Sequence, residues 1–459
     1  MKAIIAATIL GIVLMYSGFL SKDKKSIVSI AIIAMLALLG INIWELTTAS
    51  ATEPQMLFNK MLRIDKYAIW FNTLMTGCTF LYFLLAGKHI KEVGNHVAEY
   101  FALIFFILCG MYLLTGYNNL LMLFIGVEIL SIPQYILAGS DKKNLKSNEA
   151  SLKYFLMGAF TTGILLMGIT LLYGATGSFN ILDYTFLQAD TLNPMALSGI
   201  ILIMIAFAFK ISAAPMHTWT PDVYDGAPTA FTAFMATIVK AGAFIGFLRL
   251  FHIAFGSISS QWMMTLAVIT AATLFVGNIT AVFQQSVKRM LAYSSIAQAG
   301  FMLFAVVSVN ATAWQGITLY AVAYSVATIG MFAVLLKMKD YTYDGFNGLA
   351  KKQPALAFFT TVFLLSLAGI PLTGGFWAKY FVLTSAVQQG GMLWLVIFAL
   401  LMAAVSIYYY FRVIIAMYFK TGDAELNHEV TATDRLLLAV TCIIVILLGV
   451  APHLFLYSA

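Results

Sequence analysis

Four charged side chains lie in the middle of long apolar stretches, away from any predicted loop: Glu128, Lys210, Lys240 and Lys379. On insertion scales a charge at the centre of a membrane helix costs about 2.5 to 3.5 kcal/mol, so these four cost on the order of 10 to 14 kcal/mol against hydrophobic replacements. Desolvation favours the neutral form of a lysine, whereas a nearby carboxylate favours the charged form, so a buried lysine suits proton transfer. The four residues therefore indicate ion translocation, and they favour protons.

The acidic residue has polar neighbours on its own helix. Glu128, Ser131 and Tyr135 share one helical face at positions i, i+3 and i+7. We expect this face to meet Lys210, so that moving Glu128 nearer or farther loads or unloads the lysine. The alternative is a static buried pair of Glu128 and Lys210.

The two other lysines have no predicted acidic partner. Lys240 continues a stripe of small and polar residues that includes Thr229 and Thr232, and we count no second acidic residue inside the membrane that could pair with it. The helices predicted between residues 262 and 419 contain no acidic residue at all. We therefore expect Lys379 to release its proton readily and to be the last site of a path.

Two prolines stand in mid-helix, at Pro215 and Pro371. A proline donates no backbone hydrogen bond and clashes four residues back, which frees the carbonyls of Ile211 and Leu367 inside the membrane. Such backbone persists only against protein or internal water. Each predicted helix break has a lysine of the set close by, which two simple packing kinks, the alternative, would not require.

Several weaker candidates accompany these residues. They are His217 just after the first break, the Ser294 and Gln298 pair at i and i+4, and Asn278. Tyr408, Tyr409 and Tyr410 are interpreted as a packing or interface cluster, and Glu149 with Lys153 as an interfacial ion pair, with no function assigned to either.

The elements that must position these residues are transmembrane helices. Apolar residues make up 61% of the 459 residues and charged residues 10%, and apolar runs of bilayer-spanning length recur throughout. The predicted fold is all-α and integral to the membrane, with about fourteen helices. They are expected at 1–20, 26–47, 64–87, 97–115, 118–139, 149–174, 195–222, 228–251, 262–283, 289–309, 314–337, 355–389, 392–419 and 432–456.

Basic residues predict the orientation of these helices. Fifteen lie in loops after odd-numbered helices, Lys22 among them, and four lie in loops after even-numbered helices. The positive-inside rule then puts the odd loops in the cytoplasm and both termini on the opposite side, in a multi-pass protein of a bacterial cell (inner) membrane. The first apolar stretch is interpreted as an uncleaved helix rather than a signal peptide.

The two broken helices are the seventh and the twelfth, and they cross the bilayer in opposite senses, as corresponding members of inverted repeats do. We therefore expect three N-terminal helices at 1–96, a first five-helix repeat at 97–251, an inverted second repeat at 262–419 and a C-terminal helix at 432–459.

Other kinds of site are not indicated. The three cysteines lack metal-site or disulfide spacing, so no metal is expected. Basic residues in short membrane loops do not suggest nucleic acid. There is no glycine-rich dinucleotide loop, P-loop or nucleophile triad, which excludes redox or ATP chemistry on this chain alone.

Several stretches resemble the antiporter-like membrane subunits of respiratory complex I, and most closely the subunit N family. They are FKIS at 209–212, PMHTWTPDVY at 215–224, GAP at 226–228, EASLKY at 149–154, KRMLAYSSI at 288–296 and SLAGIPLTGGF at 366–376. The resemblance spans nearly the whole chain. The absence of the C-terminal extension typical of the larger relatives favours subunit N.

The resemblance implies roles for the buried charges. Glu128 matches the fifth-helix glutamate that pairs with the seventh-helix lysine, Lys210. Lys240 matches the lysine that links two half-channels, and Lys379 matches the exit-side lysine. FMN, iron-sulfur clusters, NADH and quinone would be held by partner subunits, and other antiporter-like subunits would be neighbours in the bilayer.

Three functions stay open at this stage. The first is a proton-translocating subunit of NADH-quinone oxidoreductase. The second is a subunit of a multisubunit cation/proton antiporter, which needs no electron donor. The third is a scaffold subunit that pumps nothing.

Overall fold

The computed structural model describes residues 1–20, 23–50, 54–94, 96–189 and 192–456, without the side chains of Lys91, Glu92 and Phe186. Lys22, which the orientation argument counts, and the C-terminal residues 457–459 lie outside the described part. Within it, twelve helical segments are long and apolar enough to cross a membrane. Two shorter apolar helices, α7 (Pro194–Lys210) and α15 (Pro354–Ala368), accompany them.

The long helices follow the predicted spans closely. In the first half they are α1 (Lys2–Leu20), α2 (Lys24–Thr48), α3 (Lys66–Val93), α4 (Val97–Gly116), α5 (Leu120–Ala138) and α6 (Leu145–Thr176). After α7 come α8 (Trp219–Gly226), α9 (Thr229–Phe234), the π-helix η3 (Met235–Val239), α10 (Lys240–Arg249) and the π-helix η4 (Leu250–Ala254). In the second half they are α11 (Ser259–Val282), α12 (Val287–Val307), α13 (Ala311–Leu335), α14 (Leu349–Lys352), α15, α16 (Gly374–Gln389), α17 (Leu393–Phe419) and α18 (Ala432–Val450).

Side chains fix many helix starts. Asn119, Asn144 and Asn193 each accept a hydrogen bond from a backbone N–H in the first turn of α5, α6 and α7. Thr431 and Asp434 form a capping box at the start of α18. These caps satisfy N–H groups that have no partner within the helix, and they stop each span at a defined residue.

Two helices end in the middle of apolar sequence. The helix α7 ends at Lys210, and eight residues separate it from α8. The helix α15 ends at Ala368, and five residues separate it from α16. Pro215 and Pro371 lie in these interruptions, where each removes a backbone donor. Ser212 (φ 67°) and Leu372 (φ 71°) adopt the left-handed backbone there, which non-glycine residues rarely do.

A short β-hairpin departs from the all-helical expectation. Strands β1 (Gln55–Leu57) and β2 (Leu62–Ile64) pair antiparallel between α2 and α3. The connecting residues Phe58, Asn59 and Lys60 all have positive φ. The sequence showed no alternating apolar pattern here that could have predicted strands this short.

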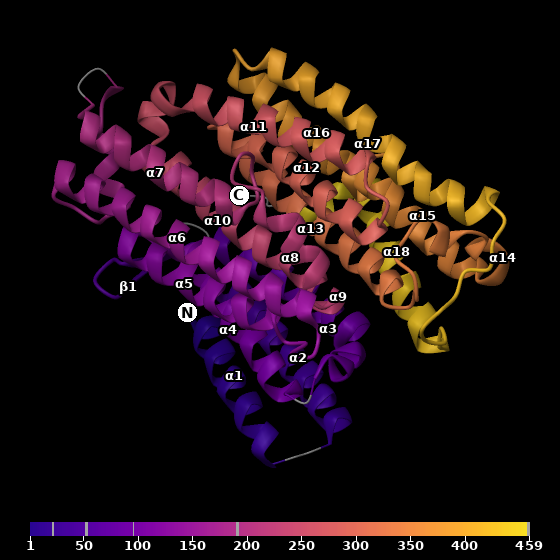
Figure 1. Ribbon diagram of the computed structural model, residues 1–459. Coiled ribbons are helices and arrows are strands. Elements are labelled where there is room, and N and C mark those ends of the chain that lie inside the picture. Colours follow the sequence, from indigo (N-terminus) through magenta and orange to yellow (C-terminus); the bar gives the residue numbers. More distant parts are fainter. Residues whose placement is uncertain (21–22, 51–53, 95, 190–191, 457–459) are drawn as a thin grey trace.

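The core lies between the two ends of the helix array. Segment Thr229–Ala254 and helices α12 and α13 are almost entirely buried, whereas α1, α6 and α17 expose large apolar side chains such as Phe19, Phe160 and Leu401. Figure 1 shows α1 to α4 at one end, α14 to α18 at the other, and α10, α12 and α13 between them.

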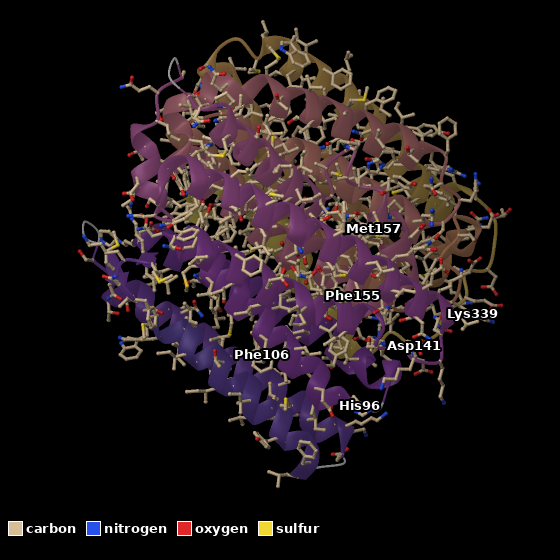
Figure 2. The ribbon with its side chains drawn as sticks, turned by 60° about the vertical axis from the view of Figure 1, so that its left-hand side comes forward. His96, Phe106, Asp141, Phe155, Met157 and Lys339 are labelled. Carbon is tan, nitrogen blue, oxygen red and sulfur yellow. The ribbon has the colours of Figure 1, made fainter. Side chains whose placement is uncertain are left out.

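The loops gather in two groups. Loops after predicted helices 9, 11 and 13 meet each other through a Ser286–Thr342 bridge, a Met338–Leu426 bridge and a Lys339–Glu425 ion pair. Loops after predicted helices 2, 4 and 6 meet through Leu62–Tyr117 and Asn119–Asn180 bridges. These odd loops and these even loops therefore form two separate groups. In Figure 2, His96, Asp141 and Lys339 from three odd loops lie along one edge of the molecule.

Candidate functional site

The first cluster joins α5, α6 and α7. Lys210 is the last residue of α7, and its Nζ donates to Ser131 Oγ at 2.8 Å and to Tyr135 OH at 3.3 Å. The half-buried Glu128 accepts a hydrogen bond from Thr162 Oγ1 at 2.8 Å. The predicted polar face of α5 thus meets Lys210.

Glu128 and Lys210 are not in direct contact in this cluster. Among the described residues no ion pair joins them, so the pairing that the resemblance implies is not a direct salt bridge in this structure. Each charge is bound by a neutral hydroxyl instead. Two hydroxyls hold the ammonium and a third holds the carboxylate.

The first helix break is held by side chains from neighbouring elements. Ala214 N donates to Thr273 Oγ1 at 2.9 Å, and Trp219 Nε1 donates to Phe209 O at 3.1 Å. His217 is half-buried beyond Pro215, and its Nδ1 is buried without a hydrogen-bond partner in the described part of the chain. The structure does not bring His217 into the first lysine cluster.

Lys240 lies at the centre of the molecule. It is 2% exposed and follows directly on the π-helical turn η3. Its Nζ donates to Ser295 O at 2.9 Å and also to Ser295 Oγ, and it lies 5.8 Å from the centre of the Tyr224 ring. Among the described residues, neutral oxygens alone bind this ammonium.

A further acidic residue was not counted in the sequence analysis. Glu45 is 7% exposed near the end of α2. It binds the amino group of Met1 and accepts from the backbone N–H of Ala3 at 3.0 Å. The carboxylate is therefore already occupied by the start of α1, and it provides no partner for Lys240.

Gln298 connects the centre to the second break. Its Nε2 donates to Leu367 O at 2.9 Å and to Tyr410 OH at 3.1 Å, and its Oε1 accepts from Tyr320. Ser294 in turn binds the hydroxyl of Tyr410. The predicted Ser294 and Gln298 pair thus forms one buried network, which lies next to Ser295.

Asn278 lies beside this network without entering it directly. Its Oδ1 accepts from Tyr409 OH at 3.1 Å, and its Nδ2 donates to Leu274 O in its own helix. Tyr409 packs against Tyr410 with ring centres 4.5 Å apart. Asn278 therefore supports the tyrosine that neighbours the network.

Lys379 lies at the second break. Its Nζ donates to Ala368 O at 2.7 Å and to Leu367 O at 3.2 Å, and it lies 4.7 Å from the centre of the Phe301 ring. The Leu367 carbonyl, which Pro371 was predicted to free, is thus shared by Lys379 and Gln298. At Gly375 a Cβ would lie 1.7 Å from Ser366 O, so only glycine allows α16 to start this close to α15.

The structure therefore connects Lys240 with Lys379 but leaves the Lys210 cluster apart from them. Ser295 and Ser294 are chain neighbours, and Leu367 O binds both Gln298 and Lys379, so adjacent polar contacts lead from Lys240 to Lys379. In the described part of the chain, no hydrogen bond links the Lys210 cluster to Lys240. Between them lie the stacked rings of Tyr154 and Trp219, 4.5 Å apart.

Sequence reasoning missed Tyr410 and Tyr320 of the network and Tyr409 beside it. Tyr409 and Tyr410 were assigned to a packing cluster, but both are 0% exposed and hydrogen-bonded inside the protein, whereas Tyr408 is 59% exposed. A tyrosine inside an apolar helix needs a partner for its hydroxyl, and this was the available signal.

The described chain contains no group of three or more His, Cys, Asp or Glu side chains placed to hold a metal. Cys78, Cys109 and Cys442 are free and buried.

Comparison with known proteins identifies the family of this chain. A family model described as NADH:quinone oxidoreductase/Mrp antiporter, TM matches residues 117–407, which contain all four buried charges. The chain belongs to this antiporter family.

Relatives in the antiporter family match along the full length. The chain is 40% identical over 460 residues to NADH-quinone oxidoreductase subunit N of Cytophaga hutchinsonii, with 99% of each chain covered. It is similar to a chain of respiratory complex I from Thermus thermophilus with bound aureothin, at 30% identity and a TM-score of 0.84, with 98% of each chain covered. A chain of the Mrp complex from a Dietzia species shares the fold, at 18% identity and a TM-score of 0.83, with 99% and 96% covered.

Proposed function

We propose that this chain is a proton-translocating subunit in the membrane arm of an NADH-quinone oxidoreductase, as the counterpart of subunit N. The observation that carries the proposal is the set of three buried lysines, each bound by neutral oxygens. A lysine held this way can lose its proton without leaving a buried carboxylate uncompensated. The full-length similarity to subunit N of Cytophaga hutchinsonii supports the same assignment.

The finer fold is part of the proposal. Twelve long spans and the two broken ones would give fourteen crossings, with inverted repeats at 97–251 and 262–419, the N-terminal group at 1–96 and the last helix at 432–459. The contacts among the loops after helices 9, 11 and 13 and among those after helices 2, 4 and 6 support this topology. The basic odd loops would face the cytoplasm, and both termini would face outward from the cell (inner) membrane.

The proton path would run along the row of buried charges. A shift of Glu128 relative to Lys210 would change the proton affinity of that lysine. Lys240 would exchange protons through Ser295, and the Ser294, Tyr410 and Gln298 network would line the route to Lys379, where internal water would carry the proton past the Gln298 amide and the Leu367 carbonyl. In the described part of the chain, Ser212 Oγ and Thr220 Oγ1 are buried without hydrogen-bond partners near the first break, and internal water there would bridge the gap between Lys210 and Lys240.

The redox chemistry would belong to partners. FMN, iron-sulfur clusters, NADH and quinone would be held by other subunits of the assembly, among them further antiporter-like subunits as neighbours. The half-buried Glu128 lies beside exposed apolar residues of α5 such as Ile125 and Ile132, a surface that a neighbouring membrane subunit could cover.

A second candidate is a subunit of a multisubunit cation/proton antiporter. The shared fold with the Mrp complex favours it, but identity of 18% supports the fold alone. A non-pumping scaffold is the third candidate, and it gives no reason for buried lysines.

The proposal is tested by purifying the tagged chain in mild detergent and assaying NADH oxidation coupled to quinone reduction. The proposal expects this activity to co-purify. A stable assembly that lacks it, but exchanges sodium for protons in liposomes, would support the antiporter instead.

Lys240→Met then tests the path. Methionine keeps the length of the side chain and removes the charge, so we expect NADH-driven proton pumping to be lost from an assembled complex. The exposed Lys420→Met is the matched control and should pump normally. Normal pumping by Lys240→Met would contradict a proton path through this chain and would support the scaffold function.

A further inference from the structure

The second helix break rests on the C-terminal helix. At Gly449 in α18, a Cβ would lie 2.3 Å from both C and O of Leu372 and 2.5 Å from the backbone N of Thr373. These are main-chain atoms, so they cannot move aside as the end of a flexible side chain can. The main chain of the break between α15 and α16 therefore packs directly against Gly449. We call this contact of Leu372 and Thr373 with Gly449 the seat.

The left-handed backbone of Leu372 belongs to this seat. Leu372 has φ 71°, a conformation that β-carbon sterics disfavour, and its side chain is 72% exposed. The side chain therefore contributes little packing there. Leu372 thus adopts this unfavourable conformation at the point where its main chain packs against Gly449.

A hydrogen bond joins the same two elements. Trp377 Nε1 donates to Gly449 O at 2.8 Å. Gly449 lies in the last turn of α18, where carbonyls have no helical donor, so the indole satisfies a group that would otherwise lack a partner inside the membrane. Trp377 is two residues before Lys379 on α16.

The far end of α18 is fixed as well. Asp434 binds Lys88 of α3, and its Oδ2 accepts from Lys337 Nζ at 2.9 Å and from Thr431 Oγ1 at 2.9 Å. The carboxylate is 5% exposed. The helix is thus held by charge at one end and by close backbone packing at the other, which makes it a brace across the second repeat.

Lys379 depends on the geometry that this brace maintains. Its acceptors, the carbonyls of Ala368 and Leu367, end α15 just before the break, while its own backbone lies just after it. Any displacement of residues 369–373 changes the distances from the ammonium to both carbonyls. Among the described residues, the hydrogen bonds of the ammonium group go to Ala368 O and Leu367 O and not to Gly449 or Trp377.

We propose that Gly449 and Trp377 are positioning residues for Lys379: they hold the break so that the ammonium stays on the two carbonyls. The inference rests on the proposed proton-translocating function. If the seat only packed the protein, its loss would lower stability without changing how pumping depends on pH.

The experiment measures the ratio of protons pumped to NADH oxidised, as a function of pH, in membrane vesicles containing the whole complex. Gly449→Ala displaces the break, and Trp377→Phe keeps a ring and removes the N–H donor. Gly40→Ala in α2 is the control, because a Cβ there meets nothing within 4 Å. Lys379→Met tests the proposed function itself.

We expect Gly449→Ala and Trp377→Phe to lower the pumping ratio toward that of Lys379→Met, with NADH oxidation retained. The pH profile of their pumping should differ from that of the parent, because the carbonyls that bind the Lys379 ammonium no longer lie at the same distances from it. Gly40→Ala should match the parent.

Two outcomes would overturn the inference. If Trp377→Phe and Gly449→Ala pump with the parent ratio and pH profile while Lys379→Met does not pump, the seat has no positioning role and the proposed function stands. If Lys379→Met itself pumps normally, the proposed function fails and the inference fails with it. Should Gly449→Ala not assemble, Trp377→Phe alone decides.

Discussion

Lys210, Lys240 and Lys379 are bound by serine and tyrosine hydroxyls and by backbone carbonyls rather than by carboxylates. A carboxylate bound directly to each ammonium would stabilise the charged form and resist proton release. Hydroxyls accept and donate, so the same contact can bind the charged and the neutral lysine. At the scale of single residues, these contacts therefore suit lysines that exchange protons better than lysines that stay permanently charged.

Tyr410→Phe tests this argument. It removes the hydroxyl that joins Ser294 to Gln298 and changes little else, so we expect reduced proton pumping and a loss of about 0.5 to 1.5 kcal/mol of stability. Pumping is measured by quenching of a pH-sensitive dye in vesicles.

Tyr408→Phe on the same helix is its control, because that hydroxyl is on an exposed side chain. Equal pumping by both variants would remove Tyr410 from the path.

Residue type and position could be predicted for the charges but not for their contacts. Glu128, Lys210, Lys240 and Lys379 stand out because charge is costly in apolar sequence. Which hydroxyl each would meet depends on how helices distant in sequence pack, as with Lys240 and Ser295, and no local pattern contains that information. The absence of a direct Glu128–Lys210 pair is a detail of this kind.

At the scale of elements, the spans could be predicted because bilayer thickness sets their length and prolines mark their interruptions. The hairpin at β1 and β2 could not, because its stabilising contacts come from elsewhere in the chain. Arg249 of α10, which is 2% exposed, donates to Arg63 O at 3.2 Å and to Asp65 Oδ2 at 3.0 Å. It also donates to Thr115 O at 2.9 Å.

Arg249→Met should therefore weaken the junction between α3, α4 and α10. Removing one partner of a buried charge pair costs about 3 to 5 kcal/mol, and here several carbonyls also lose their donor. We expect less assembled complex on native gels and a lower midpoint of thermal unfolding.

The exposed Arg435→Met provides the comparison. An Arg249→Met complex as stable as the Arg435→Met complex would contradict the role of Arg249 as a junction residue.

At the scale of the whole molecule, the contacts within the two groups of loops agree with the alternation of helix direction that the spans predict. The sequence predicts the cytoplasmic face from the basic residues of the odd loops. It could not predict that some of these residues are buried. Lys288 is 5% exposed and donates to the carbonyls of Asp225 and Ala227, and Lys337 is 3% exposed.

Cysteine labelling checks the orientation. In intact cells we expect a membrane-impermeant maleimide to modify Lys60→Cys in an even loop but not Lys351→Cys in an odd loop. After permeabilisation both should react. The parent chain is the background control, since its own cysteines are buried. Labelling of Lys351→Cys from outside would invert the proposed topology.

The contacts of Arg249 also bear on how the chain is made. Its acceptors lie on Arg63, Asp65, Thr115 and Tyr117, and all of them precede it in the sequence. Chains are synthesised from the N-terminus, so each acceptor has left the ribosome before the arginine does. The buried guanidinium of Arg249 can thus meet its ligands as soon as it enters the bilayer, whereas Lys240 has to wait for Ser295, which is translated later.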